Sequence, residues 1–125
     1  MQLEFNSNKP IYSQIMDHVK IMIATGQFKP SERLPSVRDF GLELKVNPNT
    51  VQKAFAELEK DGLIATPPNA KSVVHVSPAA LDRLRAEVLE GQVSGLVAVA
   101  KGAGLNREQL AAMIHTSWDN NGGAQ

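Results

Sequence analysis

The side chains with the clearest chemistry lie in one short stretch, between Asn47 and Lys53. Asn49 and Gln52 each carry an amide, which offers a donor beside an acceptor and can read the edge of an adenine in the major groove. Thr50 can hold a phosphate or meet a thymine methyl group, and Lys53 can neutralise a backbone phosphate. These residue types at this spacing indicate contact with double-stranded DNA. The alternative is a solvated helix cap, because Asn-Pro is also a common way to begin a helix.

A helix must present these side chains at its N-terminal end. Asn47 is a favoured N-cap residue, Pro48 suits the first helical position, and Gly62 is a typical residue to end the helix. The first turn of a helix exposes unpaired N–H groups and a partial positive charge, which attract a phosphate. The acidic residues lie toward the other end, so the charge is graded in the direction that DNA docking requires. The predicted inward face consists of Val51, Ala54, Phe55 and Leu58.

Two predicted helices come before this one. Apolar residues at helical spacing predict the first over about residues 10–25, after a short edge strand expected at Leu3–Phe5. Ser36 begins a stretch that resembles a capping box, with aspartate in the usual glutamate position, and predicts the second helix over about residues 36–44. Only two residues then separate this helix from Asn47, so the two helices must cross steeply. That geometry is the helix-turn-helix unit.

The segment after the third helix predicts a β-hairpin, because two apolar ends flank a polar centre. Its strands are expected near Leu63–Thr66 and Ser72–Val76. Pro67 and Pro68 cannot donate ladder hydrogen bonds, so the hairpin should be short or splayed, and Asn69 suits a positive φ angle. Three helices followed by a hairpin form the winged helix-turn-helix layout. The predicted fold class is therefore mostly α (α+β), with a small β-hairpin wing.

The chain changes character at Ser77. Apolar residues continue at helical spacing and predict two further helices, the second of which opens with a capping box of Asn106 and Gln109. We expect a winged helix-turn-helix DNA-binding domain over residues 1–76, a helical dimerisation extension over residues 77–119, and a frayed tail over residues 120–125.

The extension is expected to join two chains. The stretch Val93–Leu105 is too apolar and too glycine-rich for a fully exposed helix, and the winged domain ahead of it has a core of its own. A two-fold dimer would cover these residues, partly within one chain and partly between chains. The alternative is a monomer in which the last helix folds back on the first. The predicted dimer residues are Leu81, Leu84, Val88, Leu96, Val97, Val99, Leu110, Met113 and Ile114.

Composition sets limits on the other classes of protein. The chain has 125 residues, of which 42% are hydrophobic, enough for a buried core. Its formal net charge is zero, so a DNA-binding prediction depends on where the charges sit. It has no cysteine, no long apolar run and no signal-peptide pattern, which suits a protein of the reducing cytoplasm without a membrane partner.

No arrangement of residues in the sequence suggests catalysis. His18, His75 and His115 fall in different predicted elements at spacings that do not suit a metal, so surface or locally bonded histidines are expected. No nucleophile–base pair, Walker loop or glycine-rich dinucleotide motif occurs. We therefore expect no enzyme activity, no cofactor and no metal site.

Several sequence blocks, in order, resemble one family. They are Pro10–Ile15, Gly26–Gly41, Val46–Ile64 and the hairpin, and together they are similar to the DNA-binding domain of the GntR family of bacterial transcription regulators. The opening VNPNTV and the short C-terminal extension resemble its YtrA subfamily. The resemblance implies a dimeric repressor without a large effector domain, of a kind often linked to transporter operons. It also implies DNA contacts from Ser36, Arg38, Asn47, Pro48, Asn49, Thr50 and Gln52.

The sequence departs from that family at two places. Many relatives outside the subfamily carry arginine where Pro48 and Gln52 stand, and the loss of these arginines removes bidentate guanine contacts. The departure implies an operator that differs from those of the arginine-bearing relatives and is richer in A·T steps. The wing tip has Asn69, Ala70 and Lys71 where relatives are rich in glycine, and Lys71 can reach the edge of the minor groove.

The resulting hypothesis is a dimeric repressor that binds a pseudo-palindromic DNA operator and blocks polymerase. A winged-helix protein-interaction module that has lost DNA binding is the rival from another class, because the net charge is zero and the wing is atypical. A small-molecule effector bound among the helices of the extension is compatible with the first hypothesis, although no residue indicates which effector that would be.

Overall fold

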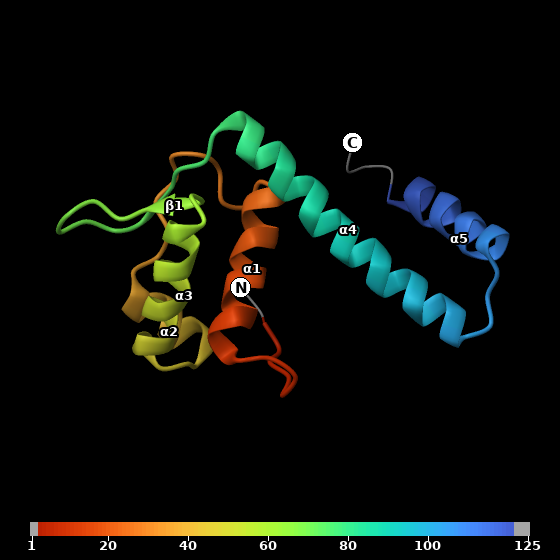
Figure 1. The fold of residues 1–125 in the computed structure, drawn as a ribbon, viewed down its shortest axis with the longest axis horizontal. Coiled ribbons are helices and arrows are strands. Elements are labelled where there is room, and N and C mark those ends of the chain that lie inside the picture. Colours follow the sequence, from red (N-terminus) through yellow and green to blue (C-terminus); the bar gives the residue numbers. More distant parts are fainter. Residues whose placement is uncertain (1–2, 122–125) are drawn as a thin grey trace. The chain divides into compact units, whose positions relative to one another are not determined.

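Three helices, a small hairpin and two further helices follow one another in the order that the sequence predicts. The computed structural model describes residues 3–121, so residues 122–125 of the predicted frayed tail lie outside the described part of the chain. The chain divides into two compact units, one ending at Val88 and the other beginning at Leu89. The mostly α fold with a β-hairpin wing is confirmed. The elements are α1 (Ile11–Ala24), α2 (Val37–Leu44), α3 (Pro48–Lys60), β1 (Ile64–Ala65), β2 (Val73–Val74), α4 (Pro78–Gly102) and α5 (Arg107–Asn120) (Figure 1).

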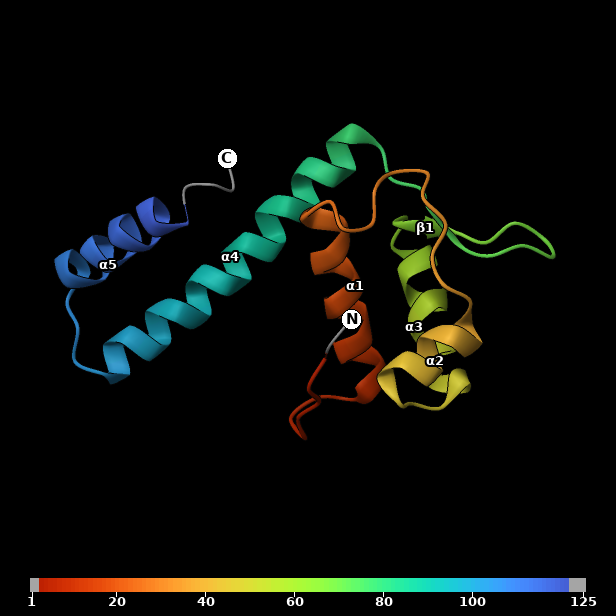
Figure 2. The same ribbon diagram turned by 180° about the vertical axis from the view of Figure 1, so that it is seen from behind.

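The core of the first unit lies where α1, α2 and α3 meet. In both views α1 and α3 lie side by side, and α2 packs against α3 (Figures 1 and 2). All four side chains predicted for the inward face of α3 are buried. The rings of Phe40 and Phe55 meet edge to face with centroids 5.4 Å apart, which contributes about 0.5–1.5 kcal/mol beyond the area buried. The largest fully buried side chains are Phe40, Ile15, Ile23, Leu34, Leu58, Val19, Val51 and Val74.

Local hydrogen bonds begin the helices where the sequence predicts them. The Asp39 N–H donates to the Ser36 hydroxyl at 3.1 Å, and the Asn49 N–H donates to the Asn47 side chain at 2.8 Å. Only this half of the predicted capping box forms at Ser36, because aspartate is one methylene shorter than glutamate. The complete box forms at the start of α5, with both hydrogen bonds at 2.8 Å.

The turn between α2 and α3 is short because the chain approaches α2 closely at Gly41. Lys45 ends α2 in the left-handed region, with φ at 60°. The Val46 N–H then donates to the Gly41 carbonyl at 2.9 Å. A Cβ at Gly41 would stand 2.8 Å from the Val46 carbonyl oxygen, closer than such atoms pack. The missing side chain therefore lets the turn fold back on α2 and sets where α3 begins.

Replacing Gly41 with alanine is expected to destabilise the first unit. The added methyl group would press on the backbone of the turn, and overpacking of this kind costs about 1–3 kcal/mol. Unfolding in urea measures the change. Gly91→Ala is the control, because a Cβ at Gly91 meets no described atom within 4 Å and alanine favours the helix. An unchanged midpoint for Gly41→Ala would show that the turn can move aside without cost.

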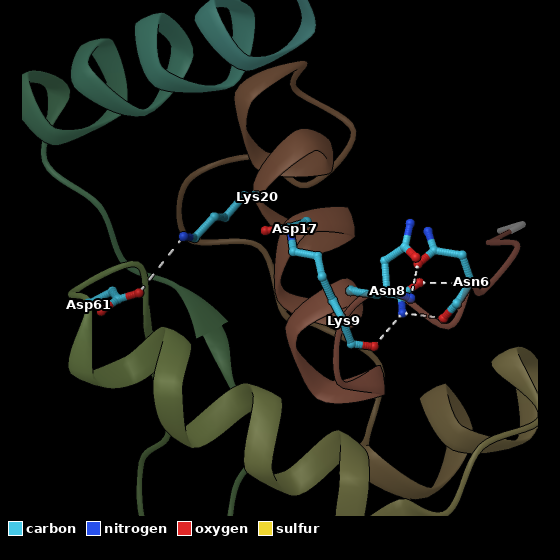
Figure 3. A network of polar contacts seen from close by, with 7 residues as sticks. Asn6, Asn8, Lys9, Asp17, Lys20 and Asp61 are labelled. Carbon is cyan, nitrogen blue, oxygen red and sulfur yellow. Dashed lines mark hydrogen bonds and ion pairs between the residues drawn. The ribbon is translucent and has the colours of Figure 1, made fainter. Parts of the chain in front are cut away.

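The N-terminal segment does not form the edge strand predicted at Leu3–Phe5. Its two apolar side chains instead pack, half-buried, against the core. The buried Gln14 amide fixes the segment, since its nitrogen donates to the carbonyls of Asn6 at 2.8 Å and Lys9 at 2.9 Å (Figure 3). Its oxygen accepts from the Asn6 N–H at 3.0 Å. The prediction was wrong because no strand pairs with Leu3–Phe5, and the Gln14 amide instead fixes the backbone that follows, at Asn6 and Lys9.

A third segment of the chain joins the hairpin, a feature that sequence patterns do not indicate. Arg33 forms an isolated bridge with Val73 of β2. Backbone hydrogen bonds of 2.8 to 2.9 Å on either side of this bridge hold residues 31–34 against β2. Leu34 is buried in the core and anchors this loop there. The loop before α2 is thereby fixed to the base of the wing.

His18 differs from the expectation that every histidine is solvated or locally bonded. Its Nε2 atom is buried in the first unit and meets no hydrogen-bond partner in the described part of the chain. Burial lowers the pKa of this imidazole below its ordinary value of 6.5, because the charged form loses hydration. His75 and His115 are exposed. Among residues 3–121, no three His, Asp or Glu side chains gather as a metal site would require.

Acid is expected to destabilise the fold through His18. Because its folded-state pKa is lowered, the unfolded chain binds the proton more readily, and stability present above about pH 6.5 is lost as the pH falls below that value. His18→Leu should flatten the dependence of the urea midpoint on pH between about 7.5 and 5.5. The exposed His75 provides the control, since His75→Leu should keep the wild-type dependence. Equal slopes in all three proteins would assign the pH dependence to other groups.

Candidate nucleic-acid interface

The exposed face of α3 carries the predicted base-reading residues. At 3.6 residues per turn, Asn49 and Lys53 lie on the face opposite the buried stripe, and Gln52 lies on one flank of it. These three side chains are exposed, whereas Thr50 is half-buried. Asn47 is exposed too, and because its side-chain oxygen caps the helix, its amide nitrogen remains a donor. The start of α3 thus presents amide, hydroxyl and ammonium groups together.

A groove opens between α3 and the wing, and it gathers predicted DNA contacts from distant parts of the chain. Ser36 comes from the start of α2, Gln52 from α3, and Lys71 from the second arm of the wing. The groove has a volume of about 570 Å³, and Thr66 and Asn69 also line it. Hydroxyl, amide and ammonium groups suit the oxygens of phosphates and sugars. Sequence reasoning did not include Thr66 and Asn69, because only the fold brings them to α3.

The wing is a short hairpin closed by a defined turn. β1 and β2 pair antiparallel over two residues each, which confirms the short hairpin predicted from the two prolines. Beyond this pairing, the hydroxyl oxygens of Thr66 and Ser72 are 2.7 Å apart. At the tip, the Ala70 N–H donates to the Pro67 carbonyl at 3.2 Å, and Asn69 has φ at 57°. Proline in the second and asparagine in the third position are typical of a type II turn, so Asn69 supplies the positive φ as predicted.

Charges on the first unit are arranged as DNA docking requires. Arg38 is exposed in the first turn of α2 and forms no ion pair with a described residue, so its donors remain for a phosphate. The acidic side chains lie at the far end of α3. There the Lys60 ammonium lies 3.3 Å from the Glu57 carboxylate. The Lys20 ammonium lies 3.9 Å from the Asp61 carboxylate, as Figure 3 shows. The negative charge of α3 is therefore partly paired and distant from its N-terminal end.

Lys53 meets an aromatic ring that spacing rules do not indicate. Its ammonium lies 4.2 Å from the centroid of the Tyr12 ring, in the first turn of α1. The two residues are far apart in the sequence and meet because α1 and α3 lie side by side (Figure 2). Tyr12 therefore belongs to the surroundings of the candidate site.

The residues predicted for a dimer interface fall into two groups. In the first unit, Leu84 is 4% exposed in the core, and Leu81 and Val88 pack half-buried against the same core. These three side chains already have partners inside one chain. In the second unit, Val97 and Leu110 are half-buried. The remaining predicted residues are exposed, and they are Leu96, Val99, Met113 and Ile114.

The second unit leaves much of its apolar surface in water. None of the residues of α5, all of which the structure describes, is buried. Trp118 on α5 is 77% exposed, and Leu89 and Val93 on α4 are exposed as well. Exposed apolar side chains gathered in one small unit are typical of an interaction surface. Within residues 3–121, no helix is long and apolar enough to span a membrane.

Several known proteins are similar to this chain in sequence and in fold. Residues 11–74 match the family described as bacterial regulatory proteins, gntR family. An uncharacterised HTH-type transcriptional regulator, YhcF of Bacillus subtilis, is 32% identical over 116 residues, which cover 93% of this chain and 96% of that protein. The HTH-type transcriptional repressor YtrA of the same organism is 44% identical over 66 residues, which cover 53% of this chain and 51% of the repressor. A solved GntR family transcriptional regulator from Listeria monocytogenes superposes with a TM-score of 0.75 at 28% identity, across 90% of this chain and 98% of that one.

The three-helix core, the wing and the donor-rich start of α3 define a winged helix-turn-helix protein, of the class that regulates transcription by binding DNA. The sequence match runs through the same elements, from the start of α1 to the end of β2. The chain belongs to the GntR family, within its YtrA-like subfamily. The resemblance drawn from the sequence blocks is thereby confirmed.

Proposed function

We propose that the protein is a dimeric repressor that binds a pseudo-palindromic DNA operator and thereby blocks polymerase. The observation that carries this proposal is the start of α3, which exposes Asn49, Gln52 and Lys53 beside a groove lined by Ser36 and Lys71. In a helix-turn-helix protein, this part of the second helix enters the major groove. One relative is a transcriptional repressor, which supports repression as the outcome of binding.

Two sets of DNA contacts are proposed. Base edges are read by Asn49 and Gln52, and Thr50 meets a thymine methyl group or a phosphate. Such contacts specify the sequence, whereas contacts to phosphates and sugars hold the protein in register. The residues proposed for the backbone are Ser36, Arg38, Asn47, Lys53 and, at the edge of the minor groove, Lys71.

The dimer is proposed from the exposed apolar side chains of the second unit. Because no residue of α5 within 107–120 is buried, a second copy packed across a two-fold axis would remove much apolar surface from water. Two chains would then present α3 to successive major grooves, about 10 bp or more apart. Residues 1–76 would bind DNA, and residues 77–119 would join the chains.

The proposal also concerns the setting in which the protein works. A protein that binds chromosomal DNA would work in the cytoplasm. A small-molecule effector that binds among the helices of the extension, and favours one arrangement of the two chains, would connect a signal to operator release. Calorimetry with candidate effectors, in the presence and absence of operator DNA, would detect this coupling.

Gel shift and anisotropy measurements with the region upstream of the protein's own gene test DNA binding. Wild-type affinity is expected to show a sequence preference and to fall steeply, by about 10³-fold or more, between about 50 and 200 mM salt. Arg38→Ala should weaken binding to every sequence and reduce the slope of log affinity against log salt by about two for a dimer.

Arg83→Ala is the matched control, because it removes the same charge from an exposed position on α4. Its salt slope should equal that of the wild type. Binding without sequence preference, or the same slope for Arg38→Ala as for the wild type, would contradict the proposed role of this surface.

A further inference from the structure

The Lys53 side chain lies over the face of the Tyr12 ring. The ammonium lies 4.2 Å from the ring centroid, which is the geometry of a cation–π contact. Tyr12 is half-buried and packs against the core of the first unit. Two residues further on, the buried Gln14 ties the start of α1 to the N-terminal segment. The core therefore fixes the position of the ring, whereas the Lys53 side chain is exposed to solvent.

The contact holds the positive charge of Lys53 without neutralising it. Lys53 forms no ion pair with any residue in the described part of the chain, and Glu57, one turn along α3, lies 3.3 Å from Lys60 instead. A carboxylate partner would cancel the charge that attracts a phosphate. A tyrosine ring attracts the ammonium through its quadrupole and leaves the net charge and the outward N–H donors available.

The contact also lies on a particular flank of α3. Gln52 lines the groove beside the wing, whereas Lys53, about 100° further round the helix, turns toward α1. A lysine side chain free in water samples many rotamers, and this freedom is lost when it binds a phosphate. A ring that restricts the ammonium before DNA arrives reduces that loss.

We propose that Tyr12 is a positioning residue for DNA binding, whose ring holds the Lys53 ammonium where α3 meets a backbone phosphate on the α1 side of the major groove. This inference rests on the proposed function. The effect comes from the face of the ring, so the tyrosine hydroxyl is not required. Ordering one flexible side chain before binding corresponds to about a two- to fivefold effect on operator affinity.

Three single substitutions and one double substitution test the proposal. Tyr12→Phe keeps the ring face, Tyr12→Leu removes it, and Lys53→Met removes the charge from a side chain of similar length. We expect Tyr12→Phe to bind the operator as the wild type does, and Tyr12→Leu to bind about two- to fivefold more weakly. Lys53→Met should reduce the salt slope. Adding Tyr12→Leu to the Lys53→Met protein should not lower the operator affinity further, because the ring acts through the lysine.

Two binding results would overturn the proposal. If Tyr12→Phe binds as weakly as Tyr12→Leu, the hydroxyl and not the ring face is responsible. If Tyr12→Leu weakens the Lys53→Met protein as much as it weakens the wild type, the two residues act independently. Urea unfolding of each variant detects a purely structural effect, which would lower the midpoint of Tyr12→Leu and leave DNA binding by folded protein unchanged.

NMR of the full chain gives a readout that does not depend on DNA. The methylene protons of Lys53 should be shifted upfield by the ring in the wild type and in Tyr12→Phe, and unshifted methylenes would overturn the placement even where Tyr12→Leu fails to fold. If the upfield shift is present but the wild type binds no operator, the proposed function fails while the lysine–ring contact stands. If the wild type binds and the variants behave additively, only the positioning role fails.

Discussion

Replacing Ile114 with aspartate is expected to leave the protein monomeric and to weaken its operator binding by about 100-fold or more. Ile114 is 47% exposed, next to the exposed Met113, on a helix whose described residues are all unburied. If these side chains contact the same side chains of a second chain across a two-fold axis, a carboxylate placed there would lose hydration and repel the equivalent carboxylate of the other chain. Each half-site would then bind an independent chain, without the high effective concentration that a joined pair provides.

Light scattering gives the mass of the free protein, and titrations with a full operator and with a single half-site give the two affinities. Ala112→Asp is the matched control, because it adds the same charge to an exposed position about 200° round α5 from Ile114. The control should remain dimeric with full affinity. Ile114→Asp should bind the single half-site as well as one wild-type subunit does, since α3 is unchanged. A dimeric Ile114→Asp protein would exclude this face of α5 from the interface.

Short-range signals predict the helices of this protein well, because the hydrogen bonds that begin them are local. Ser36 and Asn47 cap α2 and α3 through partners within three residues. The period of the helix fixes which side chains of α3 face the core, and the exposure of Asn49 and Gln52 follows from the same period. The fold and the exposed face of α3 were therefore within reach of the sequence alone.

Contacts between distant segments lie beyond such local rules. Backbone hydrogen bonds hold residues 31–34 against β2, although their own sequence pattern indicates only a loop. Leu3–Phe5 shows the reverse case: alternation predicts a strand, but no strand pairs with it, and the Gln14 amide holds the adjoining Asn6 in a loop. The Tyr12–Lys53 contact depends on how two separate helices pack. Each of these features required the tertiary fold, since no residue type at a fixed spacing encodes it.

The groove between α3 and the wing also depends on contacts between distant segments of the chain. Ser36 and Lys71 meet there because the segment before α2 and the second arm of the wing are joined through β2. The tip of the wing lacks glycine, yet its proline and asparagine form a defined turn. An atypical wing sequence is therefore compatible with a wing that stands beside α3.

Replacing Gln52 with alanine is expected to cost about 1–3 kcal/mol at one preferred base pair and much less at the alternatives. Gln52 is exposed on the flank of α3 that borders the wing groove. Its amide can pair with both the N6 and N7 positions of adenine, and alanine cannot. The operator preference at that position should consequently relax, whereas the salt slope should stay the same because no charge is lost.

A change in the preferred base pair is stronger evidence for base readout than a loss of affinity, and a second variant, Gln52→Arg, tests for such a change. Arginine binds guanine through O6 and N7, so Gln52→Arg should move the preference at the same base pair from A·T toward G·C. Competition against a panel of operators, each varied at one half-site position and measured at fixed salt, tests both variants. Glu59→Gln is the control, because Glu59 is exposed on the same flank two turns further along α3. A uniform loss across the panel for Gln52→Ala would place Gln52 on the DNA backbone and leave base readout to Asn49.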